Sequence, residues 1–152
     1  MNFSGEIDIK AQPAEVWAAL SDPEVLRRCI PGCEELQGSL SEGYSAVVIQ
    51  KIGPMKAKFR GKVTISELVP DQKYTLAGQG DGGIAGFAKG ESTVTLSATQ
   101  DGTHLVYEVT AAIGGKMAQL GNRLMSGVVS KLTAEFFANF REALAERVKA
   151  EA

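Results

Sequence analysis

The chain has 152 residues, of which 44% are hydrophobic and 22% charged, so it is large enough for a single domain over residues 1–152 with its own core. Its net charge of −2 gives no reason to expect a nucleic-acid partner, and no apolar run in the sequence is long enough to cross a bilayer. Because the first residues also lack the basic and apolar segments of a signal peptide, we expect a cytoplasmic protein.

The N-terminal part of the chain predicts one strand and two short helices. Apolar and polar residues alternate over Asn2–Lys10, which is typical of a half-buried strand. Pro13 and Pro23 each suit the first position of a helix, where the missing N–H has no partner to lose. Pro31 and the glycine after it end the second of these helices.

Six more strands are expected between this segment and residue 114, separated by turns rich in Gly, Asp and Pro. Alternation is cleanest in the third, where apolar residues face one way and Lys, Arg and Thr the other. That pattern is typical of an antiparallel sheet with one buried and one solvated face. The expected spans are Glu34–Leu40, Tyr44–Ile52, Met55–Leu68, Tyr74–Gly80, Gly86–Thr99 and Thr103–Gly114.

One long amphipathic helix is expected from Lys116 onward. This segment contains no proline, and its apolar residues recur in steps of three and four from Met117 to Val148. A helix of roughly 33 residues would be about 50 Å long. We therefore predict an α+β protein in which a curved antiparallel sheet of about seven strands wraps around the long C-terminal helix, with two short helices after the first strand. Because one helix cannot fill a wide sheet with many small inward residues, a cavity is plausible.

The order of these elements resembles the helix-grip fold of START-type lipid-transfer domains, polyketide cyclase-like proteins and the birch-pollen-allergen superfamily. The opening AQPAEVWAALSDP at residues 11–23 is similar to the start of many members. Three motifs more specifically resemble the CoxG family of carbon monoxide dehydrogenase subunits. They are Asp22–Leu26 running into Cys29–Cys33, the glycine-rich Gly82–Gly90, and Gly114–Gly121.

This resemblance implies a non-enzymatic accessory protein of a molybdenum hydroxylase such as carbon monoxide dehydrogenase. It further implies an apolar ligand, a quinone or lipid, in an internal cavity, and a role in linking the enzyme to the membrane by peripheral contact at the inner membrane face. No metal and no covalent cofactor are expected. Two alternatives remain open: an adaptor with a packed core that recruits the enzyme without a ligand, and a cyclase-like or hydrolase-like enzyme, for which no acid–base pair is visible.

Two sets of side chains are the candidate site residues. The proposed cavity would be lined by apolar and aromatic residues of the strands and the helix. These are Trp17, Phe59, Leu76, Ile84, Phe87, Tyr107, Leu120, Leu124 and Val128. No acidic residue occurs between Glu42 and Glu67, and a basic stripe on that stretch would dock on a membrane or a partner, or would simply be a solvated face or a protected sheet edge. The stripe consists of Lys56, Lys58, Arg60 and Lys62.

Several other features have a functional and a structural interpretation. The glycines of residues 78–90 suit a cavity gate or membrane-touching loop, or a bulged hairpin. Gly121 and Gly127 would each cost about 1 kcal/mol inside a helix, which close packing, a ligand or a bend would explain. For Cys29 and Cys33 we favour structural thiols over a redox or metal role, and for His104 a surface position over a catalytic one.

Overall fold

The computed structural model describes residues 1–151 and contains one antiparallel sheet, three α-helices and two short 3-10 turns. In chain order the elements are β1 (Asn2–Ile9), α1 (Pro13–Ser21), α2 (Pro23–Cys29), β2 (Cys33–Ser39), β3 (Gly43–Ile52), β4 (Met55–Val69), β5 (Lys73–Asp81), η1 (Gly83–Ala85), β6 (Phe87–Ala98), β7 (Thr103–Gly114), η2 (Lys116–Leu120) and α3 (Asn122–Glu151).

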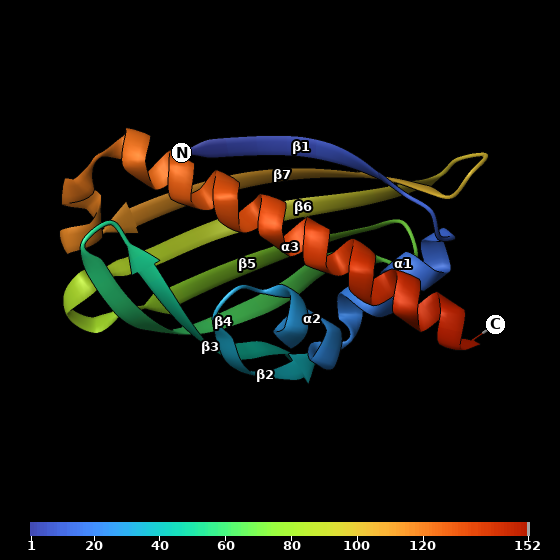
Figure 1. Ribbon diagram of the computed structural model, residues 1–152, viewed down its shortest axis with the longest axis horizontal. Helices are drawn as coiled ribbons and strands as arrows, with labels where there is room; N and C mark the ends of the chain where they lie inside the picture. Colours follow the sequence, from blue (N-terminus) through green and yellow to red (C-terminus); the bar gives the residue numbers. More distant parts are fainter. Residues whose placement is uncertain (152) are drawn as a thin grey trace.

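The seven strands form a single sheet in the order β1-β7-β6-β5-β4-β3-β2. Strands β2 to β7 follow one another as a meander, and β1 closes the sheet by pairing with β7. The sheet curves, α3 runs diagonally across it, and α1 and α2 lie at one end (Figure 1). This is the helix-grip fold expected from the sequence, and each of the seven predicted strands is present.

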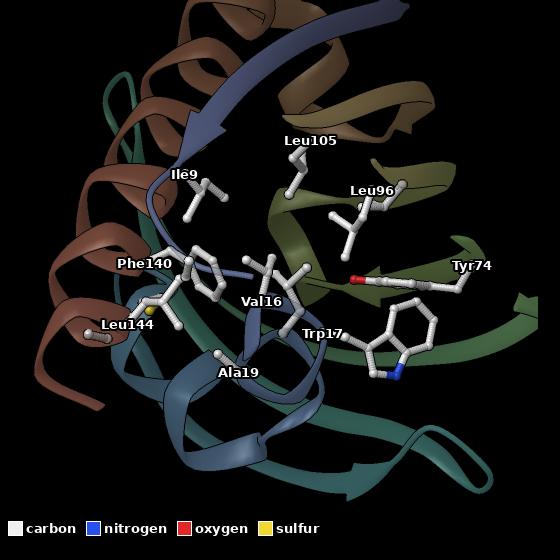
Figure 2. Packing of buried hydrophobic residues seen from close by; sticks show 14 residues of the cluster. Ile9, Val16, Trp17, Ala19, Tyr74, Leu96, Leu105, Phe140 and Leu144 are labelled. Atoms are coloured by element: carbon white, nitrogen blue, oxygen red, sulfur yellow. The ribbon is translucent and has the colours of Figure 1, made fainter. Parts of the chain in front are cut away.

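Alternation of side chains determines which face of the sheet is buried. In β4, Ala57 is buried while Lys56 and Lys58 on either side of it are exposed. The larger part of the core lies where α1 and the C-terminal half of α3 meet the sheet, and Phe140, Leu105 and Val16 are almost wholly buried there (Figure 2). The sheet therefore presents one apolar face to the helices and one polar face to solvent.

The long helix begins later than the sequence predicted. A 3-10 turn spans Lys116–Leu120, and α3 starts only at Asn122. The backbone of Gly121 has φ +92°, and that of Gly115, before the turn, has φ +79°. These left-handed conformations interrupt a helix although the apolar pattern continues through the segment, because Met117 still packs into the core from the 3-10 turn. Of the described residues, no helix is both long and apolar enough to span a membrane.

Candidate functional site

Two adjoining apolar hollows lie between α3 and the inner face of the sheet. The first hollow has a volume of about 310 Å³ and lies toward α1 and α2. The second hollow, of about 410 Å³, lies toward η2. Ile30, Thr133 and Phe136 line both, so the two spaces meet beneath the middle of α3.

Strand alternation builds the floor of the first hollow. Tyr74 and Leu76 are two apart in β5 and share its inner face, as Leu105, Tyr107 and Val109 do in β7. The helix supplies the opposite wall through Phe136 and Phe137. All of these residues expose carbon to the space, which makes the hollow suited to an apolar molecule.

The second hollow combines strand and helix residues from the other end of the molecule. Phe59 of β4 and Ile113 of β7 face Met125 and Val128 of α3 across it. Thr133 borders it without adding a free polar group, because its hydroxyl donates to the Val129 carbonyl at 2.8 Å. This hollow is therefore also apolar.

Hydroxyl groups provide the polar chemistry at the first hollow. The Tyr44 hydroxyl donates to the Ser21 carbonyl at 2.7 Å. Burial raises the pKa of both Tyr44 and Tyr74, so both phenols are protonated at neutral pH. Among the described residues that line either hollow, the ionisable side chains are three tyrosines, Tyr44, Tyr74 and Tyr107. A carboxylate, histidine or lysine for acid–base chemistry is not among these residues.

Four of the nine predicted ligand residues line the hollows: Leu76 and Tyr107 the first, Phe59 and Val128 the second. Trp17 is buried behind the first hollow, where its ring meets that of Tyr74 edge-on at 5.3 Å. It belongs to the packed core and does not line either space.

The other four predicted ligand residues lie elsewhere. Leu120 and Leu124 approach Gly53 at the turn between β3 and β4, and Leu124 is 38% exposed. Ile84 and Phe87 are 82% and 53% exposed on the outside of the molecule. The reason is that η1 inserts between β5 and β6, so that Ala85, and not its neighbour Ile84, points into the core.

The glycine-rich segments pack against each other. The backbone of Gly86 has φ +119°, and a Cβ on Gly115 would lie 2.5 Å from the Gly86 Cα. The segment before β6 and the segment after β7 thus touch through their backbones, which requires glycine at the contact. Gly127, in contrast, is exposed, and a Cβ there would meet no heavy atom within 4 Å. Neither close packing nor a place beside the hollows explains it.

All four residues of the predicted basic stripe are exposed on the outer face of β4. The structure divides them between two surroundings. Lys58 forms an ion pair with Glu34 at 3.6 Å. Arg60 and Lys62 instead line a broad surface depression of about 1130 Å³. We call it the basic surface; its other cationic and apolar lining residues are Lys89, Lys116, Ile84 and Phe87.

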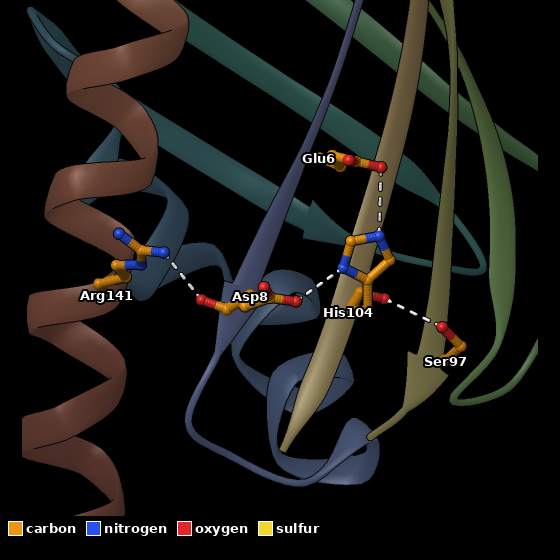
Figure 3. A network of polar contacts seen from close by, with 5 residues as sticks. All are labelled: Glu6, Asp8, Ser97, His104 and Arg141. Atoms are coloured by element: carbon orange, nitrogen blue, oxygen red, sulfur yellow. Dashed lines mark hydrogen bonds and ion pairs between the residues drawn. The ribbon is translucent and has the colours of Figure 1, made fainter. Parts of the chain in front are cut away.

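His104 lies on the outer face of β7 and is held by two carboxylates of β1 (Figure 3). Its Nδ1 is 2.7 Å from Asp8 Oδ1, and its Nε2 is 3.3 Å from Glu6 Oε2. The hydrogen bond with Asp8 is the main reason that the pKa of His104 is raised. Arg141 of α3 donates to the Asp8 carbonyl at 2.8 Å, so this cluster ties the edge strand to the helix.

Both cysteines are free thiols. Cys29 is fully buried in the core, and burial raises its pKa to about 11. Cys33 is half-buried, and burial raises its pKa as well. Raised values make thiols poor nucleophiles at neutral pH. Within the described part of the chain, no group of three or more His, Cys, Asp or Glu side chains is arranged to hold a metal ion.

A family model for the CoxG subunit of carbon monoxide dehydrogenase matches residues 5–145. The chain belongs to this family. A comparison with curated proteins gives no match. Among solved structures, a conserved protein from Geobacillus kaustophilus is 33% identical, with 96% of each chain covered and a TM-score of 0.89.

More distant structures share the fold of this family member. A protein from Rhizobium leguminosarum is 19% identical, with 96% of this chain and 95% of that chain covered and a TM-score of 0.74. Ara h 8.0201 is 15% identical, with 96% of this chain and 98% of that chain covered and a TM-score of 0.67. At these identities the likeness concerns the fold alone.

Sequence reasoning overlooked Tyr74 as a residue of the first hollow. The signal was available, because Tyr74 is two residues before the predicted ligand residue Leu76 and therefore shares its face of the strand. Lys89 and Lys116 of the basic surface were also overlooked. They come from segments far from β4 in sequence, and only the curvature of the sheet brings them beside it.

Proposed function

We propose that this protein is a non-enzymatic accessory protein of a molybdenum hydroxylase of the carbon monoxide dehydrogenase type, and that it binds an apolar molecule, a quinone or lipid, inside the sheet. The observation that carries this proposal is the pair of adjoining carbon-lined hollows under α3. Each volume lies in or above the lower range of small-molecule sites, and burial of apolar surface at about 25 cal/mol per Å² would supply the affinity. The absence of carboxylate, histidine or lysine among the described residues lining these spaces favours binding over catalysis.

The test is to identify what the protein carries. Protein purified from its native host is extracted with organic solvent, and the extract is analysed by mass spectrometry. A quinone or lipid in about equal amount to the protein supports the proposal. An empty protein that also fails to take up added decylubiquinone contradicts it, and would favour the adaptor with a ligand-free interior.

We further propose that the basic surface makes peripheral contact with the inner face of the membrane. Ile84 and Phe87 project from it as apolar tips, and Arg60, Lys62, Lys89 and Lys116 line it. The acidic residue that lines it, Asp81, has one carboxylate oxygen occupied by the backbone N–H of Gly83 at 2.8 Å. Apolar side chains surrounded by cations suit an anionic lipid surface, where each cation contributes about 1 kcal/mol.

Vesicle binding tests this contact. The double variant Lys62→Glu/Lys89→Glu should lose binding to vesicles of mixed phosphatidylglycerol and phosphatidylcholine, because two attractive charges become repulsive. Lys58→Glu is the matched control, since Lys58 already pairs with Glu34 outside the basic surface. Equal binding by wild type and the double variant would refute the membrane contact while leaving ligand binding untouched.

A further inference from the structure

Tyr74 combines deep burial with an unused hydrogen-bonding group. Its side chain is 6% exposed, and Figure 2 shows its hydroxyl end directed into the interior above the Trp17 ring. Within the described chain, no hydrogen-bond partner exists for this hydroxyl, although Tyr74 lines the first hollow. Buried tyrosines normally find a partner, because leaving a hydroxyl unpaired in apolar surroundings costs on the order of 1–3 kcal/mol.

A second hydroxyl lies nearby on the same floor. Ser92 of β6 also lines the first hollow, and its hydroxyl too has no partner among the described residues. In the β5–β6 register Tyr74 pairs with Val94, and Leu76 pairs with Ser92. Tyr74 and Ser92 are therefore diagonal neighbours on one face of the sheet, a separation of about 7–8 Å between backbone positions. A single small polar group between them lies within reach of both side chains.

The contrast with Tyr44 shows that the unused hydroxyl is particular to the hollow. Tyr44 lines the same space, but its hydroxyl is fully occupied by the Ser21 carbonyl at 2.7 Å. The apolar residues around the hollow, Val63, Ile65, Leu105 and Val109, offer no polar alternative to Tyr74.

We propose that Tyr74, assisted by Ser92, anchors the oxygen-bearing head group of the ligand in the first hollow, and that the ligand is an apolar molecule with a carbonyl-type acceptor at one end. This rests on the proposed function, since it assumes that the hollow holds a ligand. The phenol donates the hydrogen bond, because burial keeps it protonated throughout the physiological pH range. The apolar remainder of the ligand extends past Phe136 and Thr133 into the second hollow, which those two residues also line.

Two probes of similar shape separate the anchor from simple burial: 2-methyl-1,4-naphthoquinone, which carries two carbonyl groups, and 2-methylnaphthalene, which carries none. Tyr74→Phe retains the ring that packs on Trp17 and removes only the hydroxyl. By equilibrium dialysis, we expect this variant to bind the quinone about tenfold more weakly, as loss of one hydrogen bond implies, and the hydrocarbon unchanged. Tyr44→Phe is the matched control and should leave the preference for the quinone unaltered, and melting temperatures check that both variants fold.

Each outcome bears on a different statement. If wild type binds both probes and Tyr74→Phe changes neither affinity, the anchor is refuted and the hollow remains a ligand site. That result would mean that water alone satisfies the hydroxyl. If wild type binds neither probe, the proposed ligand-binding function fails and the anchor fails with it. An equal loss for both probes would show that Tyr74→Phe damages the hollow itself, which also overturns the anchor.

Discussion

Replacing Gly127 with alanine should stabilise the protein. Gly127 lies inside α3 on its exposed side, and a Cβ there would meet no heavy atom within 4 Å. Since no contact opposes the added methyl group, the difference in helix propensity acts alone and favours alanine by about 0.8–1.0 kcal/mol. For a domain of this size that free energy corresponds to an increase of roughly 2–4 °C in melting temperature.

Gly121 provides a control with the same open space and a different backbone. A Cβ on Gly121 would also meet nothing within 4 Å, but the residue has φ +92°. A left-handed conformation costs an L-residue about 1–2 kcal/mol, so Gly121→Ala should lower the free energy of unfolding by about that amount. The opposite signs expected at two glycines six positions apart isolate backbone conformation from packing.

Urea and thermal unfolding, followed by far-UV circular dichroism, measure both changes. Unfolding slopes equal to that of wild type would show that the denatured state is not altered. If Gly121→Ala stabilised the protein as much as Gly127→Ala, the chain would be helical through residue 121 and the placement of the start of α3 at Asn122 would be wrong. If Gly127→Ala destabilised it, the exposed position of Gly127 would be refuted.

Two further predictions concern the second hollow and the edge strand. Val128→Trp should fill the second hollow and remove the increase in melting temperature that decylubiquinone gives wild type, which at a hundredfold excess over the dissociation constant is equivalent to about 2.7 kcal/mol; a full increase in the variant would contradict the ligand site. His104, whose pKa is raised chiefly by Asp8, should stabilise the fold fully below its unfolded pKa near 6.5 and lose this contribution as pH rises through the higher folded pKa. His104→Asn should flatten the pH dependence of unfolding in that window, and an unchanged profile would show that the Asp8 contact contributes nothing.

The strands and their faces could be predicted because each residue reports its own environment. Ala57 between Lys56 and Lys58 is enough to orient β4, since opposite faces of a strand meet such different surroundings. The same logic placed Leu76 and Tyr107 on the inner face, where both line the first hollow. Local periodicity is therefore sufficient wherever the solvent lies on one side of a regular element.

Prediction failed where a contact distant in sequence determines local geometry. The helix was expected to begin at Lys116 because the apolar pattern is continuous there, yet Gly115 is held against Gly86, which precedes β6. Ile84 was expected inside because it is apolar, but the turn at η1 directs Ala85 inward instead. In both places the deciding information belongs to the meeting of two segments, which single-chain periodicity does not contain.

The positions of the proposed anchor and the basic surface give the ligand a direction. Tyr74 lies near α1, whereas η1 and η2 lie at the opposite end of the sheet (Figure 1). At that end β6 separates the two proposed sites by its own thickness: Ala88 lines the second hollow, while Phe87 and Lys89 on either side of it line the basic surface. Under the proposed function, a molecule taken from the bilayer would then enter with its oxygen-bearing head first, and its apolar tail would come to rest closest to the membrane. An apolar molecule stored in that orientation leaves tail first, so membrane docking and release would be coupled through the same end of the sheet.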